Sequence, residues 1–204
     1  MNDKLQILQL VRLRGRTTAA DVAASTGLST GSVDSVVREL CDAGLVQDLR
    51  GRLKLTGDGR VELTELIAAE REDVDQAQMS AAYHDFSSVN ATFKQLVTDW
   101  QLVGEDKPND HTDAAYDAAV ISRLEGVHTD FRPLLERLTE LAPRLKMYPA
   151  RFDAALTKIR DGDHSWLARP LIDSYHTAWF ELHEDLIVLA GLTRADEAAA
   201  GRAQ

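Results

Sequence analysis

The strongest constraint on the fold is a glycine, Gly27, that separates two short stretches with helical patterns. Thr17 or Thr18 can cap a helix that precedes this glycine, and Ser29 or Thr30 can cap a second helix that follows it. Glycine adopts the positive φ of a tight turn without steric cost. The pattern therefore predicts two short helices joined by a tight turn.

The second of these helices has an inner and an outer face. Its apolar residues recur every three or four positions and face the interior: Val33, Val36, Val37 and Leu40. The residues left on the outer face are Ser32, Asp34, Ser35 and Arg38. Two short helices joined by a glycine turn form a helix-turn-helix, whose second helix enters the major groove of DNA. The outer face is therefore the predicted contact surface.

The flanking segments add a helix in front and a hairpin behind. Residues 5–13 carry apolar side chains on one helical face. After Gly44 the apolar period becomes that of strands, and residues 45–49 and 52–56 are predicted to pair around a turn at 50–51. Three cations of this hairpin could reach phosphates or a minor groove beside the inserted helix: Arg50, Arg52 and Lys54.

The order of these elements resembles the winged helix-turn-helix DNA-binding domain of MarR-type and related bacterial regulators. The resemblance covers about residues 4–60 and rests on the segments ADVAASTGLSTGSVDSVVRELCDAGLV and LTGDGR. It implies a transcription regulator whose partner is double-stranded DNA. It assigns the DNA contacts to the second helix and the tip of the wing, at Ser29, Thr30, Ser32, Asp34, Ser35, Arg38, Arg50 and Arg52.

An alternative is that the winged helix docks a protein and does not bind DNA. The second helix offers one cation, Arg38, against two acids, Asp34 and Glu39. A fold alone does not fix a function, so an adaptor protein is the competing hypothesis. The cations collected on the wing favour DNA.

Charge is distributed unevenly along the chain. The net charge is −10, but residues 1–60 hold nine basic and seven acidic residues, whereas residues 61–204 hold fourteen basic and twenty-six acidic residues. A slightly basic N-terminal part on an acidic remainder suits a protein that touches phosphates with one end only.

The sequence also indicates a compartment. It has no apolar run that could span a bilayer and no secretory signal pattern. Its single cysteine, Cys41, excludes an internal disulfide and a multi-cysteine metal site. We therefore expect a cytoplasmic protein.

The fold class that we predict is mainly α: an N-terminal winged helix-turn-helix with a small β-hairpin wing at residues 1–60, followed by an all-α helical bundle at 61–192 and a flexible tail at 193–204. Residues 60–103 lack Gly and Pro, and we expect a long helical region there with a break at 80–88. After a polar loop at 104–111, Thr112 can cap a helix that buries Ala115, Ala118, Ala119 and Ile121. Later helices are predicted at about 130–141, 149–160 and 169–190.

An apolar stripe runs along the second half of the long helical region: Phe86, Val89, Phe93, Leu96, Trp100 and Val103. Its spacing of three and four residues marks one helical face. This face is either part of the core of the bundle or a seam with a partner helix.

The last predicted helix holds the densest group of aromatic and ionisable side chains, in DSYHTAWFELHED. Asp173, His176, Phe180 and His183 share one face of that helix. Three interpretations are open: a partly buried helix face, a metal site at Asp173 and His176, and a small-molecule pocket. We predict no metal, because no supporting ligand from another helix is evident. The candidate effector pocket consists of Trp100, Trp166, Tyr175, His176, Trp179, Phe180 and His183.

The working hypothesis is a homodimeric regulator whose N-terminal domain binds operator DNA and whose helical domain dimerises and responds to a small-molecule effector. Catalytic motifs such as a glycine-rich phosphate loop, GxSxG or HExxH are missing, so we expect neither an enzyme nor a cofactor. Because the N-terminal domain begins close to Met1, we expect the dimer seam in the helices after Arg60, with the long helix as part of it.

Overall fold

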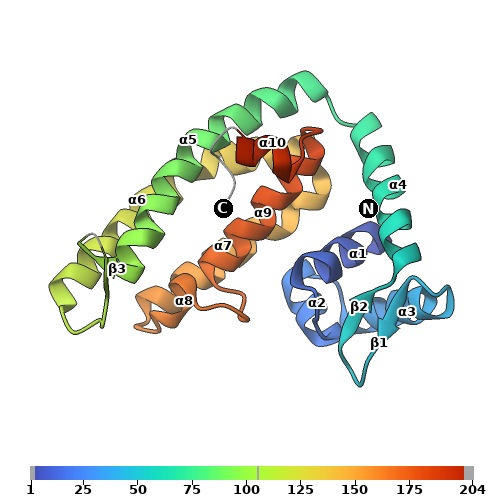
Figure 1. Ribbon diagram of the computed structural model, residues 1–204, viewed down its shortest axis with the longest axis horizontal. Helices are drawn as coiled ribbons and strands as arrows, with labels where there is room; N and C mark the ends of the chain where they lie inside the picture. Colours follow the sequence, from blue (N-terminus) through green and yellow to red (C-terminus); the bar gives the residue numbers. More distant parts are fainter. Residues whose placement is uncertain (1–2, 105, 200–204) are drawn as a thin grey trace.

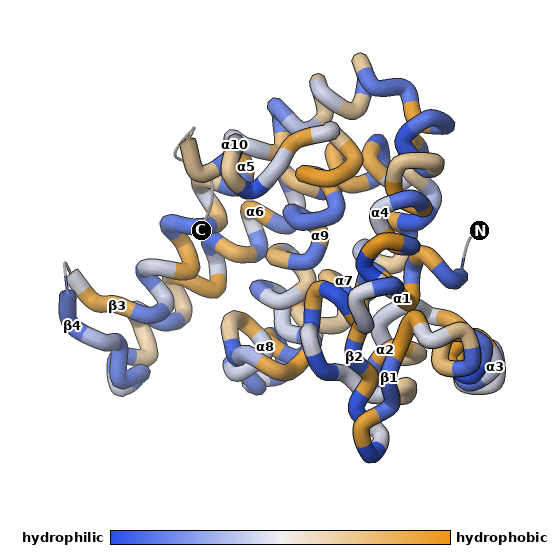
Figure 2. The backbone as a smooth tube through the Cα atoms, turned by 45° about the vertical axis from the view of Figure 1, so that its right-hand side comes forward, coloured by the Kyte–Doolittle hydropathy of each residue, from blue (hydrophilic) through white to orange (hydrophobic). Residues whose placement is uncertain are grey.

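Two hydrophobic cores organise the chain, and both are built largely from helices (Figure 1). The computed structural model describes residues 3–104 and 106–199. The head, residues 3–72, encloses the first core, and the body, residues 76–199, encloses most of the second. Hydrophobic and hydrophilic segments alternate along the helices of both parts, as burial on one side requires (Figure 2). The predicted fold class, a mainly helical chain with a small hairpin after the N-terminal helices, is confirmed.

The head comprises α1 (Asp3–Arg14), α2 (Ala19–Thr26), α3 (Thr30–Asp42), β1 (Val46–Asp48), β2 (Leu53–Leu55) and α4 (Gly57–Glu72). The body comprises α5 (Gln76–Gln101), β3 (Leu102–Val103), β4 (Lys107–Pro108), α6 (Ala114–Leu141), the 3₁₀ helix η1 (Pro143–Lys146), α7 (Met147–Arg160), α8 (Ser165–Ala168), α9 (Tyr175–Leu189) and α10 (Arg194–Ala199). No helix among the described residues is long and apolar enough to cross a membrane.

The helices of the head follow the sequence pattern closely. Thr18 caps α2 in a capping box: its hydroxyl accepts from the backbone N–H of Asp21, and its own N–H donates to the Asp21 carboxylate. Gly27 ends α2 with a φ of 72°, and Ser29 caps α3. The core of the head extends past residue 60, because Leu63 of α4 is buried in it.

The long helical region breaks at residues 73–75 and not at 80–88, where we predicted the break. Asp75 is the N-cap of α5. Its carboxylate accepts hydrogen bonds from the backbone N–H groups of Ala77 and Gln78 and from the Gln78 side chain. We predicted the break where the apolar rhythm falters, but a carboxylate cap starts a new helix without any change in the apolar pattern.

α5 and α6 lie side by side as a long antiparallel pair (Figure 1). The apolar stripe of α5 belongs to the core of the body, because four of its residues are at most 7% exposed: Phe86, Phe93, Leu96 and Trp100. Val89 is partly buried, and Val103 is 37% exposed. The body's own helices therefore cover this stripe, which leaves little of it for a partner chain.

α6 is one helix where we predicted two. It begins after Asp113, which caps it in place of Thr112, and it continues through Pro133 to Leu141. Its buried residues are Asp117, Val120, Leu124, Val127, Phe131, Leu135 and Leu138. The three alanines that we expected inside, Ala115, Ala118 and Ala119, are exposed. Larger side chains gain more from burial, so they and not the alanines decide which face turns inward.

The C-terminal part also departs from the predicted pattern. The helix predicted at 169–190 begins only at Tyr175, where Ser174 caps α9, so Asp173 lies outside the helix. Residues 194–199 of the predicted flexible tail form α10, in which Glu197 is fully buried. Residues 200–204 of that tail lie outside the described residues. A two-residue ribbon of β3 and β4, which we did not predict, closes the loop after α5.

The head is joined to the body by polar side chains of α1, a helix whose residues 5–11 are all buried. Asp185 of α9, which is fully buried, accepts hydrogen bonds from Gln9 of α1 at 2.7 Å, from Tyr148 at 2.6 Å and from Arg144 at 2.8 Å. Arg144 also pairs with Glu70 of α4 at 2.9 Å. Burial foremost, together with the charge of Asp185, raises the pKa of Tyr148 well above its ordinary value, so this phenol remains a donor.

A second centre of the same junction surrounds Asp173 and Glu181. Arg151 of α7 pairs with both carboxylates at 2.5 Å, and Arg14 of α1 pairs with them at 3.0 and 2.7 Å. Ser25 of α2 donates to Asp173 at 3.2 Å. Burial alone would raise the pKa of Asp173, but Arg151 and then Arg14 outweigh it and hold that pKa below its usual value.

The junction predicts a large effect of one buried carboxylate. We expect Asp185→Ala to lower the free energy of unfolding by about 3–5 kcal/mol, because it leaves Arg144, Tyr148 and Gln9 buried without their shared acceptor. Urea unfolding followed by circular dichroism measures the change. The control Asp153→Ala removes a carboxylate that is 51% exposed, and we expect a loss under about 1 kcal/mol. Equal losses in both variants would show that the junction adds no stability of its own.

Candidate nucleic-acid interface

The outer face of α3 is open to solvent in full. The six positions that we predicted on or beside it are all exposed: Ser29, Thr30, Ser32, Asp34, Ser35 and Arg38. Val33 and Leu40 hold the opposite face in the core of the head. α3 contacts α1, α2 and β1, so other elements of the head fix its orientation.

The wing is a tight antiparallel hairpin. Val46 pairs with Leu55, and Asp48 pairs with Leu53. Its two-residue turn has positive φ values at both positions, 58° at Arg50 and 81° at Gly51. This is the geometry of a type I′ turn, in which a non-glycine first residue is strained. The turn places Arg50 at the tip. The other predicted cations are also exposed: Arg52 directly before the returning strand and Lys54 within it.

Arg16 is a further cation near the wing that our sequence analysis did not include. Thr17 forms an isolated bridge with Leu53 of β2, in which the Leu53 N–H donates to the Thr17 carbonyl at 2.7 Å. The exposed Arg16 therefore lies beside the base of the wing. A one-residue bridge has no periodicity, so only the strand-like character of residues 16–18 between two helices could have indicated it.

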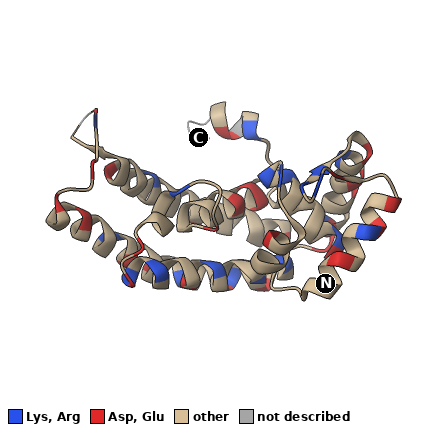
Figure 3. Ribbon diagram, turned by 90° about the horizontal axis from the view of Figure 1, so that it is seen from below, with Lys and Arg blue, Asp and Glu red and all other residues tan. Residues whose placement is uncertain are grey.

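The cations of this surface are available for an anionic partner. In the part of the chain that the structure describes, no ion pair is formed by Arg16, Arg38, Arg50, Arg52 or Lys54. By contrast, Arg14, Arg144 and Arg151 of the junction each pair with two carboxylates. Acids are present as well, since Asp34 and Glu39 are exposed on α3, and both signs of charge occur in the head and in the body (Figure 3).

The body leaves this surface uncovered. α2 contacts α7, and α1 and α4 contact α9, whereas α3 and the wing lie on the side of the head away from the body (Figures 1 and 2). A long rod such as a DNA duplex can therefore approach α3 and the wing together.

Gly59 sets the position of the wing against α4. A Cβ atom at this buried glycine would overlap the carbonyl oxygen of Leu45 and lie 2.8 Å from the Leu55 side chain. We expect Gly59→Ala to lower the free energy of unfolding by about 2–3 kcal/mol through overpacking. Gly57→Ala is the matched control, because open space surrounds that position, and its stability should stay within about 0.5 kcal/mol of the parent. Chemical denaturation of both variants measures the difference. A Gly59→Ala variant as stable as the parent would show that the space around Gly59 is not tightly packed.

The seven residues of the candidate effector pocket do not line one cavity. Four of them, His176, Trp179, Phe180 and His183, border a space of about 20 Å³ in the body. Trp100 lies at a separate groove near His111 and His164, and Trp166 lies at a cleft beside the head. Tyr175 is fully buried and packs against Phe152 and Phe93. The residues that we predicted to form one pocket therefore lie at separate places in the body.

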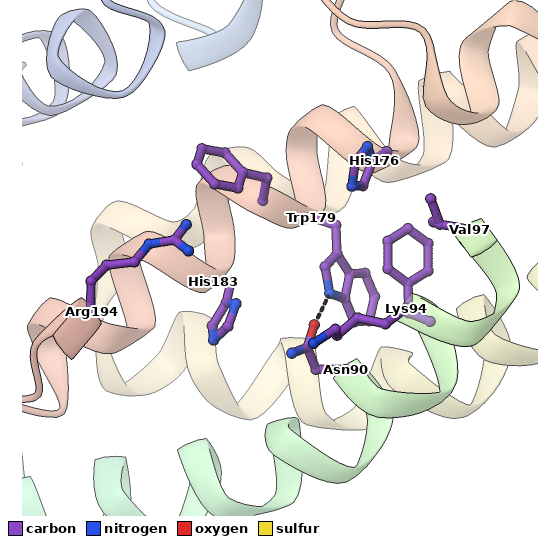
Figure 4. Close-up of a pocket in the computed structure, with 9 residues that line it drawn as sticks. Asn90, Lys94, Val97, His176, Trp179, His183 and Arg194 are labelled. Carbon is purple, nitrogen blue, oxygen red and sulfur yellow. Dashed lines mark hydrogen bonds between the residues drawn. The ribbon is translucent and has the colours of Figure 1, made fainter. Parts of the chain in front are cut away.

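The space beside Trp179 is filled by its own side chains (Figure 4). Trp179 stacks on Phe93 with ring centroids 4.2 Å apart, and its Nε1 donates to Asn90 at 2.8 Å. Lys94 and Arg194 border the same space. Its volume of about 20 Å³ accommodates a water molecule and no larger ligand.

Asp173 and His176 do not form the metal pair that we weighed. Asp173 lies before α9 and binds Arg14 and Arg151, while His176 is on the helix, where its ring is 6.2 Å from that of Phe93. Within residues 3–104 and 106–199, no three His, Cys, Asp or Glu side chains are grouped as a metal site would need.

His183 makes the stability of the body dependent on pH. Burial, and then the charge of Arg194, lowers its pKa from 6.5 to about 4. Between these pH values the unfolded chain takes up a proton that the folded chain does not. Stability is therefore full above pH 6.5 and falls as the pH approaches 4, by up to about 3 kcal/mol.

Comparing unfolding free energies at pH 7 and pH 4.5 tests this role. We expect His183→Gln to lose less stability over that interval than the parent chain does. His84→Gln, a substitution at an exposed histidine, is the control that should keep the parental dependence. If His183→Gln also keeps it, the histidine does not titrate as described.

Residues 4–47 match a family model described as winged helix-turn-helix DNA-binding, a span that runs from α1 into β1. Comparisons with curated proteins and with solved structures give no match. The head is thus a winged helix-turn-helix DNA-binding domain. A domain of this class indicates a DNA-binding regulator rather than an enzyme, and its partner is double-stranded DNA.

Proposed function

We propose that the protein is a one-component transcription regulator that binds operator DNA as a homodimer, in the cytoplasm, and responds to a small molecule through its body. The head supplies the DNA contact through α3 and the wing. The body supplies the surface on which the head is held. The MarR-like assignment of the head is part of this proposal and rests on the order of its elements.

The observation that carries the proposal is the set of unpaired cations around α3. Arg38 lies on the helix, Arg50 and Arg52 lie on the wing, and Arg16 lies beside the base of the wing. Exposed cations flanking a recognition helix are the groups that bind phosphates. Arg50 also occupies a left-handed position that costs an arginine on the order of 1 kcal/mol, which supports a role for this side chain at the tip.

A dimer is proposed because a single head offers few base contacts. α3 carries one cation against two acids, whereas two heads on successive major-groove faces would double the contacts. We place the seam in the helices after Arg60, on surfaces other than the α5 stripe, most of which the body buries. Light scattering of the free protein and of its DNA complex measures the stoichiometry, and one chain on each operator would contradict the dimer.

Replacement of the wing arginines tests DNA binding directly. We expect Arg50→Ala with Arg52→Ala to weaken binding to the DNA upstream of its own gene by on the order of 10- to 60-fold at about 0.1 M salt. The slope of log affinity against log salt should fall by about two, one for each phosphate that an arginine no longer neutralises. Fluorescence anisotropy at several salt concentrations measures both quantities.

The control replaces two exposed arginines of α6, Arg123→Ala with Arg132→Ala, and should leave DNA binding unchanged. An unrelated fragment of equal length separates specific from non-specific binding. If neither fragment binds at low salt, the regulator proposal fails, and the adaptor hypothesis, in which the head docks a protein, takes its place.

A further inference from the structure

Acidic residues occur on and near the outer face of α3, although a helix that lies against DNA gains more from cations. Two of these acids have partners within the head. Asp48 accepts a hydrogen bond from the backbone N–H of Gly51 at 2.6 Å in the turn of the wing. Glu39 accepts one from the Ser35 hydroxyl at 3.4 Å on α3 itself. The geometry of the head therefore accounts for both.

Asp34 is different, because the fold gives its carboxylate nothing to do. It is exposed, and it forms no ion pair within residues 3–104 and 106–199. Arg38 stands one turn later, at the spacing of helical ion pairs, yet the two side chains stay apart. Asp34 also lies beyond the first turn of α3, which holds no acid, so it does not stabilise the helix dipole. Stability of the head therefore does not account for Asp34.

The surface around Asp34 is low, because its neighbours have short side chains. Thr30 and Gly31 lie one turn before it, and Ser35 follows it; all three are exposed. A Cβ atom at Gly31 would meet open space, so the packing of the head does not require a glycine there. A flat surface such as the edge of a base pair can therefore come within hydrogen-bonding reach of a carboxylate on a side chain as short as that of aspartate.

Carboxylate and guanidinium groups recognise different bases in the major groove. The exocyclic amino group of cytosine donates to a carboxylate, whereas O6 and N7 of guanine together accept two hydrogen bonds from one guanidinium. Thymine presents a carbonyl oxygen where cytosine presents its amino group, so a carboxylate disfavours thymine. The residues of a recognition helix that contact base edges lie toward its N-terminus. Asp34 lies in the N-terminal half of α3, and Arg38 follows one turn later.

We propose that α3 reads a cytosine through Asp34 and a guanine through Arg38 in the major groove of its operator. This inference rests on the proposed function, because it requires α3 to lie in that groove. Four residues of helix rise about 6 Å and successive base pairs are about 3.4 Å apart, so the two bases lie within about two base pairs of each other. Asp34 thus repels phosphates in general and favours DNA that offers a cytosine amino group, which makes it a specificity-determining residue.

Selection of duplexes by the full chain, from a pool with a random central segment long enough for two half-sites, identifies the bases. We expect every enriched half-site to contain a cytosine and a guanine within about two base pairs. Fluorescence anisotropy then compares an enriched duplex with two relatives, in which the cytosine is changed to thymine or the guanine to adenine, each with its complement. The parent chain should bind each relative about 5- to 150-fold more weakly.

Substitutions assign each base to a side chain. Asp34→Ala should bind the enriched duplex and its thymine relative about equally and should keep the preference for guanine. Arg38→Ala should lose the preference for guanine and keep that for cytosine. The matched control is Asp42→Ala, which removes an exposed acid from the C-terminal end of the same helix and should keep both preferences. Because all three positions are exposed, we expect each variant to fold, which thermal melts check.

The ratio of two affinities separates base reading from charge, because the loss of a negative charge strengthens binding to every duplex alike. If Asp34→Ala binds all three duplexes more tightly and keeps the preference for cytosine, Asp34 only repels phosphates and the inference is overturned.

Enriched duplexes without this pair of bases, or a loss of the preference for cytosine in Asp42→Ala as well, would also overturn the inference. In each of these outcomes the chain still binds DNA, so the proposed function stands. Failure to enrich any duplex, together with no binding to the upstream DNA at low salt, would instead defeat the proposed function and this inference with it.

Discussion

The structure depends on the pairing of buried charges along α9 with side chains of the head. Five carboxylates face five arginines across and beside this junction: Asp173, Glu181, Glu184, Asp185 and Glu70 against Arg12, Arg14, Arg144, Arg151 and Arg194. Removing so many ions from water is costly unless each finds a partner in good geometry. The junction is therefore selective, since few orientations of the head satisfy all of these groups at once.

Apolar packing and polar contacts therefore stabilise different features of the molecule. Apolar packing builds each core, as Val33 and Leu40 do in the head and Phe86 and Phe131 do in the body. Ionic and hydrogen-bonded contacts set how the two cores meet. Such contacts depend on the protonation of their carboxylates more than apolar contacts do, and their burial limits screening by salt.

The head was largely predictable because its signals are local. Caps such as Thr18 and Ser29, the turn at Gly27 and the change of period after Gly44 each act within a few residues. The break at 73–75 escaped prediction because a carboxylate cap resembles an ordinary surface acid. The partners of Arg14 and Gln9 lie more than 150 residues away in sequence, and no periodicity relates them. The prediction of a single effector pocket was wrong for the same reason. Trp100, Trp166 and Trp179 lie on α5, α8 and α9, and the sequence does not show how these helices pack.

The linker between the two cores is only three residues long, 73–75. Such a segment spans about 10 Å at full extension, so the head has a short tether and cannot move freely away from the body. A displacement of the head from the body would therefore be limited to a rotation about residues 73–75, and it would disturb the contacts between α1 and α9. The wing lies at the end of the head opposite to this linker (Figure 1). A small rotation of the head near the linker would therefore move the tip of the wing by a larger distance.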